Sequence, residues 1–325
     1  MVGKMKQVKR HWIGFSLSLL FVGCISILYA CYKYRPLNEE RVKIGATYMT
    51  MNNDFYKALH SEINKEVEES GDILLLRDPS LNSDKQVEQL EYFIKEDCDV
   101  IVINPVDSSN SAIINKLKEA KRKGIAIVAV DSRLTDSKAV DTTILSDNYK
   151  AGIMCAENLL ATKTSAEILL LEHETTVSGS DRIRGFLDTI SGHEGYHIVA
   201  SREVKGQTEL AMPAVEEVIN EGIAFDTIMA LNDQSVLGAL AAIEVGRLEG
   251  ITVYGVDGSP NVKTLLASTD DVQATVAQSP HTIGEEAVRA AYRLADHLPY
   301  RSNIIVPVTL VTKENVHDFN ISGWQ

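Results

Sequence analysis

The sequence lacks the short motifs by which many enzymes bind phosphates or carry out covalent chemistry. Its 325 residues contain no G-x-G-x-x-G after the first predicted strand, no G-x-x-x-x-G-K-[ST], no G-x-S-x-G and no H-E-x-x-H. Those motifs provide nucleotide-binding loops, a nucleophilic serine and a zinc site. We therefore predict a protein that is not an enzyme and that carries no cofactor and no metal.

Cysteine and positive charge are also scarce. The four cysteines show no C-x-x-C spacing, and only Cys98 and Cys155 lie in the predicted folded region. These two could form a disulfide or remain separate buried thiols, and we favour the thiols. After residue 35 the chain holds 26 Lys and Arg against 45 Asp and Glu, a net charge of −19. Nucleic acid is a poor partner for so acidic a surface.

The N-terminus is the exception to this acidic composition. Residues 4–11 are basic, and residues 12–30 are an uncharged apolar run of nineteen residues, long enough for a signal sequence or a membrane span. Because basic residues before such a run stay in the cytoplasm, we expect the rest of the chain outside the cell membrane.

Three fates of segment 1–35 remain open: an uncleaved anchor, a lipoprotein signal or plain secretion. Leu28-Tyr29-Ala30 resembles the cleavage box of bacterial lipoproteins, which would make Cys31 the lipidated first residue. Cys24 is a weaker alternative for the same role. The first two fates predict a protein anchored on the extracytoplasmic face of a bacterial cell membrane.

From residue 41 onward, short apolar runs alternate with amphipathic segments. The predicted strands are 42–47, 72–76, 100–104, 126–130, 142–145, 167–171, 197–201, 227–231, 252–256, 272–277 and 304–310. The predicted helices are 55–69, 84–95, 109–122, 149–160, 181–190, 209–220, 234–245 and 283–297. Strands that are apolar throughout are typical of parallel sheets covered by helices on both faces. Because eleven strands are too many for one small open sheet, we predict an α/β fold with two doubly wound sheets.

Polar residues follow many of these strands, at the edge of the sheet where ligands bind in such folds. Several of the strand-end segments resemble the ribose type of periplasmic sugar-binding protein, in the family's order and spacing over about residues 41–315. The matching segments are TMNNDFY from Thr50, INPVDS from Ile103, VDS from Val130, SDNYKAG from Ser146, DRIRGF from Asp181, LND from Leu231, GVDG from Gly255 and TVAQ from Thr275.

The resemblance implies two Rossmann-like lobes joined by a three-strand hinge, a periplasmic binding protein fold of type I. One lobe would comprise residues 41–145 and 279–307, and the other residues 146–278 and 308–325. The hinge would lie near Ser146, Ser279 and Val308.

The resemblance also implies a sugar site between the lobes. Paired polar side chains would bind hydroxyl groups, and aromatic rings would pack on the apolar face of the sugar. The ligand-binding residues at the matching positions are Asn53, Phe55, Tyr56, Asp131, Ser132, Arg182, Asn232, Asp257 and Gln278. Arg182 would balance the two buried aspartates, and Asn232 could also cap the helix that follows it.

Two departures from the family pattern put ribose itself in doubt. Ser132 stands where the family has an arginine directly after the aspartate, with Arg133 one place late. The segment 205–207 also lacks an aromatic residue that the family commonly has near Gly206. We expect a pocket that is more open and takes another sugar or a non-sugar polyol.

The implied function is that of a monomer that binds a small neutral polyol, such as a monosaccharide, by closing its lobes. It would deliver this ligand to the membrane permease of an ABC transporter. Alternatively, it would serve as a membrane-tethered sensor for a histidine kinase or a chemoreceptor.

Overall fold

The computed structural model describes residues 21–26, residue 29 and residues 41–325. Residues 21–26 are helical, and no helix within the described residues is long and apolar enough to cross a membrane. Most of the predicted anchor, and Cys31 with it, lies outside the described residues. The chain divides between Arg41 and Val42 into two units, of which residues 42–325 are the larger.

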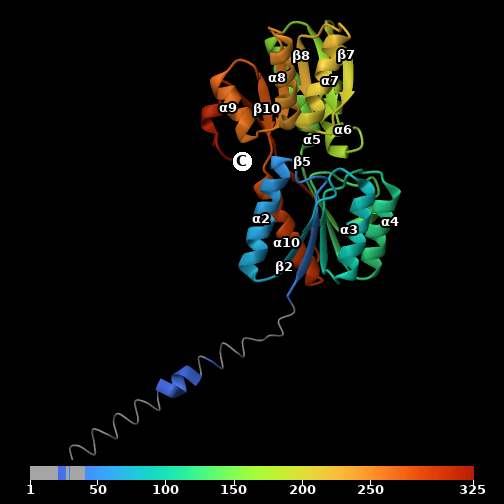
Figure 1. Ribbon diagram of the computed structural model, residues 1–325, viewed down its shortest axis with the longest axis vertical. Helices are drawn as coiled ribbons and strands as arrows, with labels where there is room; N and C mark the ends of the chain where they lie inside the picture. Colours follow the sequence, from blue (N-terminus) through green and yellow to red (C-terminus); the bar gives the residue numbers. More distant parts are fainter. Residues whose placement is uncertain (1–20, 27–28, 30–40) are drawn as a thin grey trace, which may run out of the picture. The chain divides into compact units, whose positions relative to one another are not determined.

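Within residues 42–325, the first sheet has six parallel strands in the order β11-β5-β4-β3-β1-β2. These strands are β1 (Lys43–Thr47), β2 (Ile73–Arg77), β3 (Val100–Ile103), β4 (Ala126–Val130), β5 (Thr142–Ser146) and β11 (Asn303–Val306). The helices α2 (Asp54–Ser70) and α10 (Pro280–Ala295) cover one face of this sheet. The helices α3 (Ser83–Lys95) and α4 (Ser111–Arg122) cover the other face (Figure 1).

The second sheet also has six strands, in the order β12-β10-β9-β8-β6-β7, and only β12 is antiparallel to its neighbour. Its strands are β6 (Ala166–Glu172), β7 (Tyr196–Glu203), β8 (Thr227–Ala230), β9 (Thr252–Asp257), β10 (Ala274–Ala277) and β12 (Thr309–Thr312). Its helices are α5 (Asn148–Thr162), α6 (Val177–Ile190), α7 (Thr208–Asn220), α8 (Asp233–Gly246) and α9 (Pro260–Ser268). Helix α5 packs on α6, and α7 packs on α8. The predicted α/β fold with two doubly wound sheets is confirmed.

The chain passes between the two sheets three times. It leaves β5 for α5 at Asp147, β10 for α10 at Ser279, and β11 for β12 at Pro307. These passages support the proposal that the lobes comprise residues 41–145 with 279–307 and residues 146–278 with 308–325. The buried thiols of Cys98 and Cys155 are free and belong to different lobes, so the disulfide alternative is wrong.

The structure differs from the predicted elements in two places. The predicted strand 304–310 is two strands, because Pro307 cannot donate a ladder hydrogen bond and the chain changes sheets there. The helix α9 was not predicted, although Ser259 as its N-cap followed by Pro260 is a typical helix start. The structure therefore has twelve strands within residues 42–325 rather than eleven.

Close packing of α5 on α6 depends on two glycines. A Cβ atom at Gly152 would lie 1.9 Å from the carbonyl oxygen of Arg182, and one at Gly185 would lie 2.1 Å from that of Tyr149. Both obstacles are backbone atoms, which cannot move aside as the end of a side chain can. The two glycines thus allow α5 and α6 to pack closely, and this packing determines the position of Arg182 on α6.

We expect Gly152→Ala to destabilise the protein by about 2 kcal/mol or more, because it overpacks a helix contact. Urea unfolding of the full chain measures this loss. Gly246→Ala in α8 is the matched control, since its nearest obstacle is the flexible end of Ile219 at 3.2 Å. That control should be neutral or slightly stabilising. Equal losses in both variants would mean that the α5–α6 contact is looser than the structure has it.

Candidate functional site

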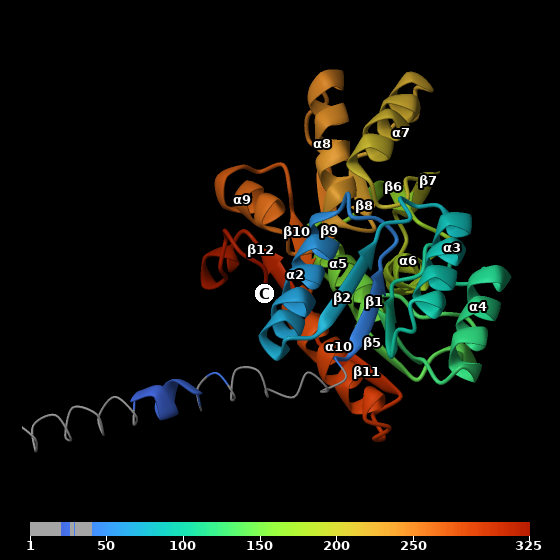
Figure 2. The same cartoon turned by 60° about the horizontal axis from the view of Figure 1, so that its bottom comes forward.

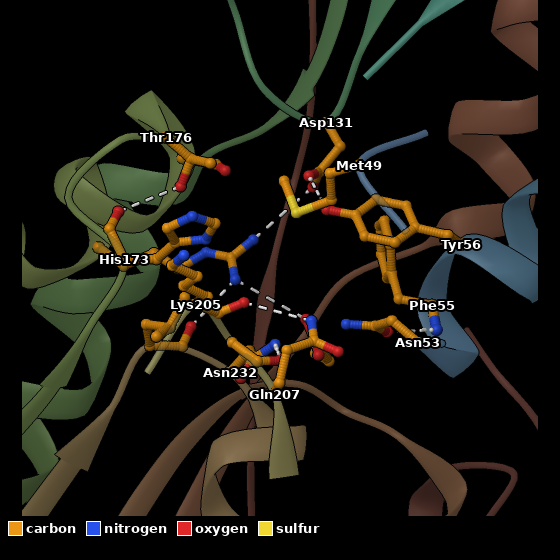
Figure 3. Close-up of a pocket in the computed structure, with 15 residues that line it drawn as sticks. Met49, Asn53, Phe55, Tyr56, Asp131, His173, Thr176, Lys205, Gln207 and Asn232 are labelled. Atoms are coloured by element: carbon orange, nitrogen blue, oxygen red, sulfur yellow. Dashed lines mark hydrogen bonds and ion pairs between the residues drawn. The ribbon is translucent and has the colours of Figure 1, made fainter. Parts of the chain in front are cut away.

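A pocket lies between the carboxyl ends of the two sheets, where the loops of both lobes meet (Figure 3). Its space not filled by protein atoms is about 360 Å³, including the part open to solvent. The lining residues are Met49, Asn53, Phe55, Tyr56, Asp131, His173, Thr176, Ser178, Arg182, Lys205, Gly206, Gln207, Leu231, Asn232 and Asp257.

The sequence-predicted residues converge on this pocket. Seven of them line it, namely Asn53, Phe55, Tyr56, Asp131, Arg182, Asn232 and Asp257. The other two, Ser132 and Gln278, are buried next to it but are not among the lining residues. Residues that are up to 204 positions apart in sequence thus share one cavity, because parallel strands end at the same edge of their sheet.

Asp131 is the acceptor that the first lobe contributes. It follows β4 directly and is 3% exposed. Its Oδ2 accepts hydrogen bonds from the Tyr56 hydroxyl (2.9 Å) and from Asn104 Nδ2 (3.2 Å). Those two bonds fix the orientation of the carboxylate and leave Oδ1 facing Arg182 across the pocket.

Arg182 is the cation that the second lobe contributes, from helix α6. Its Nε donates to Asn148 Oδ1 (2.8 Å), and its Nη1 donates to the carbonyl of Leu231 (3.0 Å). The guanidinium lies 3.8 Å from Asp131 Oδ1 and 3.8 Å from Asp257 Oδ1. These separations allow charge attraction but exceed hydrogen-bond length, so the groups keep unused capacity for a bound hydroxyl.

Asp257 is the acidic residue at the end of β9. Gln278 Nε2 donates to its Oδ1 at 2.6 Å, so Gln278 positions this carboxylate. Gln278 Oε1 is buried without a hydrogen-bond partner in the described part of the chain. A buried polar atom without a partner is costly unless a ligand or water supplies one. Gln278 therefore contacts a pocket residue, Asp257, and does not itself line the pocket. Its Oε1 remains available as a hydrogen-bond acceptor.

Burial dominates the electrostatics of the site. It raises the pKa of Asp131, although Arg182 and the hydrogen bonds from Tyr56 and Asn104 act against this rise. It raises the pKa of Asp257 further, because the charges of Asp233 and Asp131 add to burial while Arg182 opposes it. The pKa of Asp233 is also raised by burial. The charge of Arg182 thus acts against the raised pKa values of three buried carboxyl groups, those of Asp131, Asp233 and Asp257.

Both lining aspartates also have unusual backbone angles. The φ of Asp131 is 63° and that of Asp257 is 142°, in the region that favours glycine. Such strain persists only where the surrounding structure enforces it, and it concentrates at functional sites. The strained backbone therefore supports a functional role for these two carboxylates.

Two asparagines line the pocket while they also cap helices. Asn53 Oδ1 accepts from the Phe55 amide (2.9 Å) at the start of α2. Asn232 Oδ1 accepts from the Ser235 amide (3.0 Å) and hydroxyl (2.7 Å), so the predicted capping role of Asn232 is confirmed. In each case the cap occupies the oxygen. The Asn232 amide nitrogen also donates to the Gly206 carbonyl (3.1 Å), which leaves its second N–H as a donor.

Ser132 lies at the contact between the lobes rather than in the pocket. Its Oγ accepts from the Ser178 amide (3.2 Å) of the other lobe and lies 3.2 Å from Ser108 Oγ. Arg133, one place later, forms an interlobe ion pair with Asp181 at 2.9 Å. Ser132 thus contributes to the contact between the lobes, and its role in ligand binding stays a prediction.

One pocket residue of the second lobe, His173, was missed by sequence reasoning. It follows β6, is 4% exposed and lines the pocket. Burial and the charge of Lys205 lower the pKa of His173 to about 4, so its ring is neutral at neutral pH. Its position directly after a strand is the signal that could have revealed it.

The missing aromatic residue near Gly206 has a structural reason. Gly206 has a φ of 64°, and a Cβ atom there would lie 2.8 Å from Asn232 Nδ2. Position 206 itself therefore favours glycine, and Lys205 and Gln207 line the pocket beside it. This wall is polar, whereas Phe55 and Tyr56 make the opposite wall aromatic.

Two α/β lobes that meet around a polar pocket, with three chain passages between them, define a two-lobe binding protein. The model of the periplasmic binding protein domain matches residues 44–299. A ribose import binding protein of Bacillus subtilis (strain 168) is 31% identical over 288 residues, covering 85% of this chain and 89% of that protein. A ribose import binding protein of Escherichia coli (strain K12) is 25% identical over 274 residues, covering 83% and 90%.

Solved structures agree with this fold. An ABC transporter solute-binding protein from Bacillus halodurans with bound myo-inositol has a TM-score of 0.79 at 23% identity, covering 87% of this chain and 98% of that one. The chain therefore belongs to the periplasmic binding protein family, and within it to the ribose type of sugar-binding protein.

The raised pKa of Asp257 has a consequence for stability. A carboxyl group with a raised pKa in the folded state stabilises folding below its ordinary value near 4. That contribution is lost as the pH rises through the raised value. We expect Asp257→Asn to increase the free energy of unfolding at pH 7 by about 1–2 kcal/mol and to flatten its pH dependence, since asparagine tolerates positive φ.

Urea unfolding of the ligand-free full chain between pH 5 and 8 measures this effect. The exposed Asp188, changed to Asn, is the control and should leave the profile unchanged. A ligand-free Asp257→Asn variant that is less stable than the parent at pH 7 would contradict the account.

Proposed function

We propose that residues 42–325 bind a small neutral polyol, such as a monosaccharide, by closing the two lobes around it. The observation that carries this proposal is the convergence of Asp131 from one lobe with Arg182 and Asp257 from the other, each 3.8 Å from its counter-charge. A hydroxyl group is both donor and acceptor, so vicinal hydroxyls can bridge a carboxylate and a guanidinium at these distances. The aromatic wall suits the C–H face of a ring.

Contacts across the rim support closure by a hinge. The Ser108 amide donates to the Thr175 carbonyl (2.9 Å), and Asn52 Nδ2 donates to Glu209 Oε1 (2.9 Å). Together with the Arg133–Asp181 pair, these bonds join the lobes in a closed arrangement. A ligand that contacts both lobes would favour this arrangement over an open one.

The proposed partner is the permease of an ABC transporter, because curated relatives are named import binding proteins and the Bacillus halodurans structure is named a transporter component. We propose an extracytoplasmic place for residues 42–325, held at the membrane by segment 1–35 or by lipid on Cys31. A sensor kinase or chemoreceptor as the partner stays a prediction.

A thermal-shift screen of the full chain tests ligand binding. We expect at least one of ribose, allose, myo-inositol and glycerol to stabilise the protein by about 2.7 kcal/mol at 100 times its dissociation constant, roughly 5–10 °C in Tm. Asp131→Asn and Asp257→Asn should remove the shift, and the surface control Asp188→Asn should keep it. If all four compounds leave Tm unchanged, or if both pocket variants still respond, the proposed site is wrong.

The polar wall predicts the kind of ligand. His173 Nε2 lies 3.0 Å from Thr175 Oγ1, and its Nδ1 has no hydrogen-bond partner among the described residues. A neutral imidazole in this position can bind one more hydroxyl. We propose that the ligand carries hydroxyl groups on the face toward His173 and Lys205, as a cyclitol or a hydroxyl-rich sugar does.

We expect His173→Phe to weaken binding of the ligand found in the screen by about tenfold, because one hydrogen bond of the neutral ring is lost. Isothermal titration calorimetry measures this change. His193→Phe is the matched control, since His193 is exposed and is not a pocket residue. Unchanged or tighter binding by His173→Phe would mean that the ligand turns an apolar face to this wall.

A further inference from the structure

The last residues of the sequence return from the second lobe to the first. Strand β12 and the short helix η2 (Val316–Asp318) precede them, and β12 belongs to the second sheet. Trp324, however, packs against the hydrophobic core of the first lobe. Both views place the C-terminus beside α2 (Figure 1 and Figure 2). Residues 320–325 are called the return segment below.

A fully buried lysine fixes the path of the return segment. Lys263 of α9 is 0% exposed, and its Nζ donates to the carbonyl oxygens of Asn320 and Gly323 at 2.6 Å each. Charge-assisted bonds of this kind are short and strong, and a buried ammonium group is costly without them. Ser279, at a passage between the lobes, donates to the carbonyl of Gln325. The return segment is therefore held at both of its ends.

The tip of this segment contacts a pocket residue without lining the pocket. The rings of Trp324 and Phe55 are 5.8 Å apart at an interplanar angle of 80°, an edge-to-face contact. Tyr56 makes a second edge contact with Phe55, at 5.5 Å and 88°. Phe55 and Tyr56 line the pocket, whereas Trp324 is not among the lining residues. The Phe55 ring is thus fixed from outside the pocket by a residue that the other lobe supplies.

We propose that Trp324 is a positioning residue of the ligand site, held by Lys263, which sets the orientation of Phe55 for the bound ligand. This inference rests on the proposed function for its effect on binding, but the contact itself can be tested without any ligand. Because edge-to-face pairs add to the packing of aromatic rings, the removal of Trp324 should weaken binding about threefold to tenfold.

The chain supplies its own reporter for the contact. Its two tryptophans are Trp12 and Trp324, so Trp12→Phe in the full chain leaves Trp324 as the single emitter. In that background and without ligand, Phe55→Leu should change the emission maximum or intensity of Trp324. Phe93→Leu is the control, because Phe93 is equally buried but packs in a separate core cluster with α3 and α4. If Phe55→Leu and Phe93→Leu leave the same spectrum, the proposed contact is wrong.

The effect on binding is measured by calorimetric titration of the full chain with ribose, allose, myo-inositol and glycerol. Trp324→Ala and Lys263→Met should both weaken the binding seen in the parent. Phe319→Ala is the matched control: Phe319 packs on the core of the second lobe, so its loss should lower Tm and leave affinity unchanged. If Trp324→Ala does not fold, Trp324→Leu takes its place.

The outcomes separate the two proposals. Parent-like affinity in the Trp324 and Lys263 variants would overturn the positioning role while leaving the proposed function intact. If the parent binds none of the four compounds, the proposed function fails, and the fluorescence comparison alone decides whether Trp324 fixes Phe55.

Discussion

The site depends on one buried guanidinium that faces carboxylates from both lobes. Arg182 belongs to the second lobe, as Asp257 does, whereas Asp131 belongs to the first. Burial strengthens charge interactions and makes unpaired charges costly, so Arg182 offsets part of the cost of burying these two acidic groups. The 3.8 Å separations leave each group attracted but not fully hydrogen-bonded. These groups can therefore form more hydrogen bonds with a hydroxyl-rich ligand than groups whose hydrogen bonds were already all made within the protein.

The fold serves this interaction at several levels. Parallel strands bring Asp131, His173 and Asp257 to the facing edges of two sheets. The glycines of α5 and α6 let the helices approach until Arg182 reaches the Asn148 side chain and the Leu231 carbonyl. Caps, strained backbone and aromatic packing then fix the remaining groups. Polar residues that are buried in order to bind a ligand lower the stability of the fold, as is expected of such a site.

The fold and most of the pocket residues could be predicted from the sequence. The alternation of apolar and amphipathic segments predicts the two sheets, because it follows from burial on both faces. Residues directly after strands, such as Asp131 and Asp257, could be found because parallel strands place their ends together. The resemblance placed a hinge near Val308, but the apolar pattern alone predicted one strand over residues 304–310, because it continues on both sides of Pro307.

Other features depend on contacts that sequence spacing does not specify. Ser132 was expected to bind the ligand, and its side chain contacts Ser108 and the Ser178 amide of the other lobe. His173 lines the pocket because it follows β6, at the end of the second sheet that faces the first lobe. The Trp324–Phe55 contact joins residues 269 positions apart through a buried lysine, and no local pattern signals it.

The central claim is that groups from both lobes bind one polyol at the same time. A crystal structure of the full chain with the polyol that gives the largest thermal shift tests it most directly. The expected result is a ligand with oxygens within hydrogen-bond distance of both Asp131 and Arg182, between Phe55 and His173. A ligand that contacts only one lobe, or that lies outside this pocket, would contradict the account.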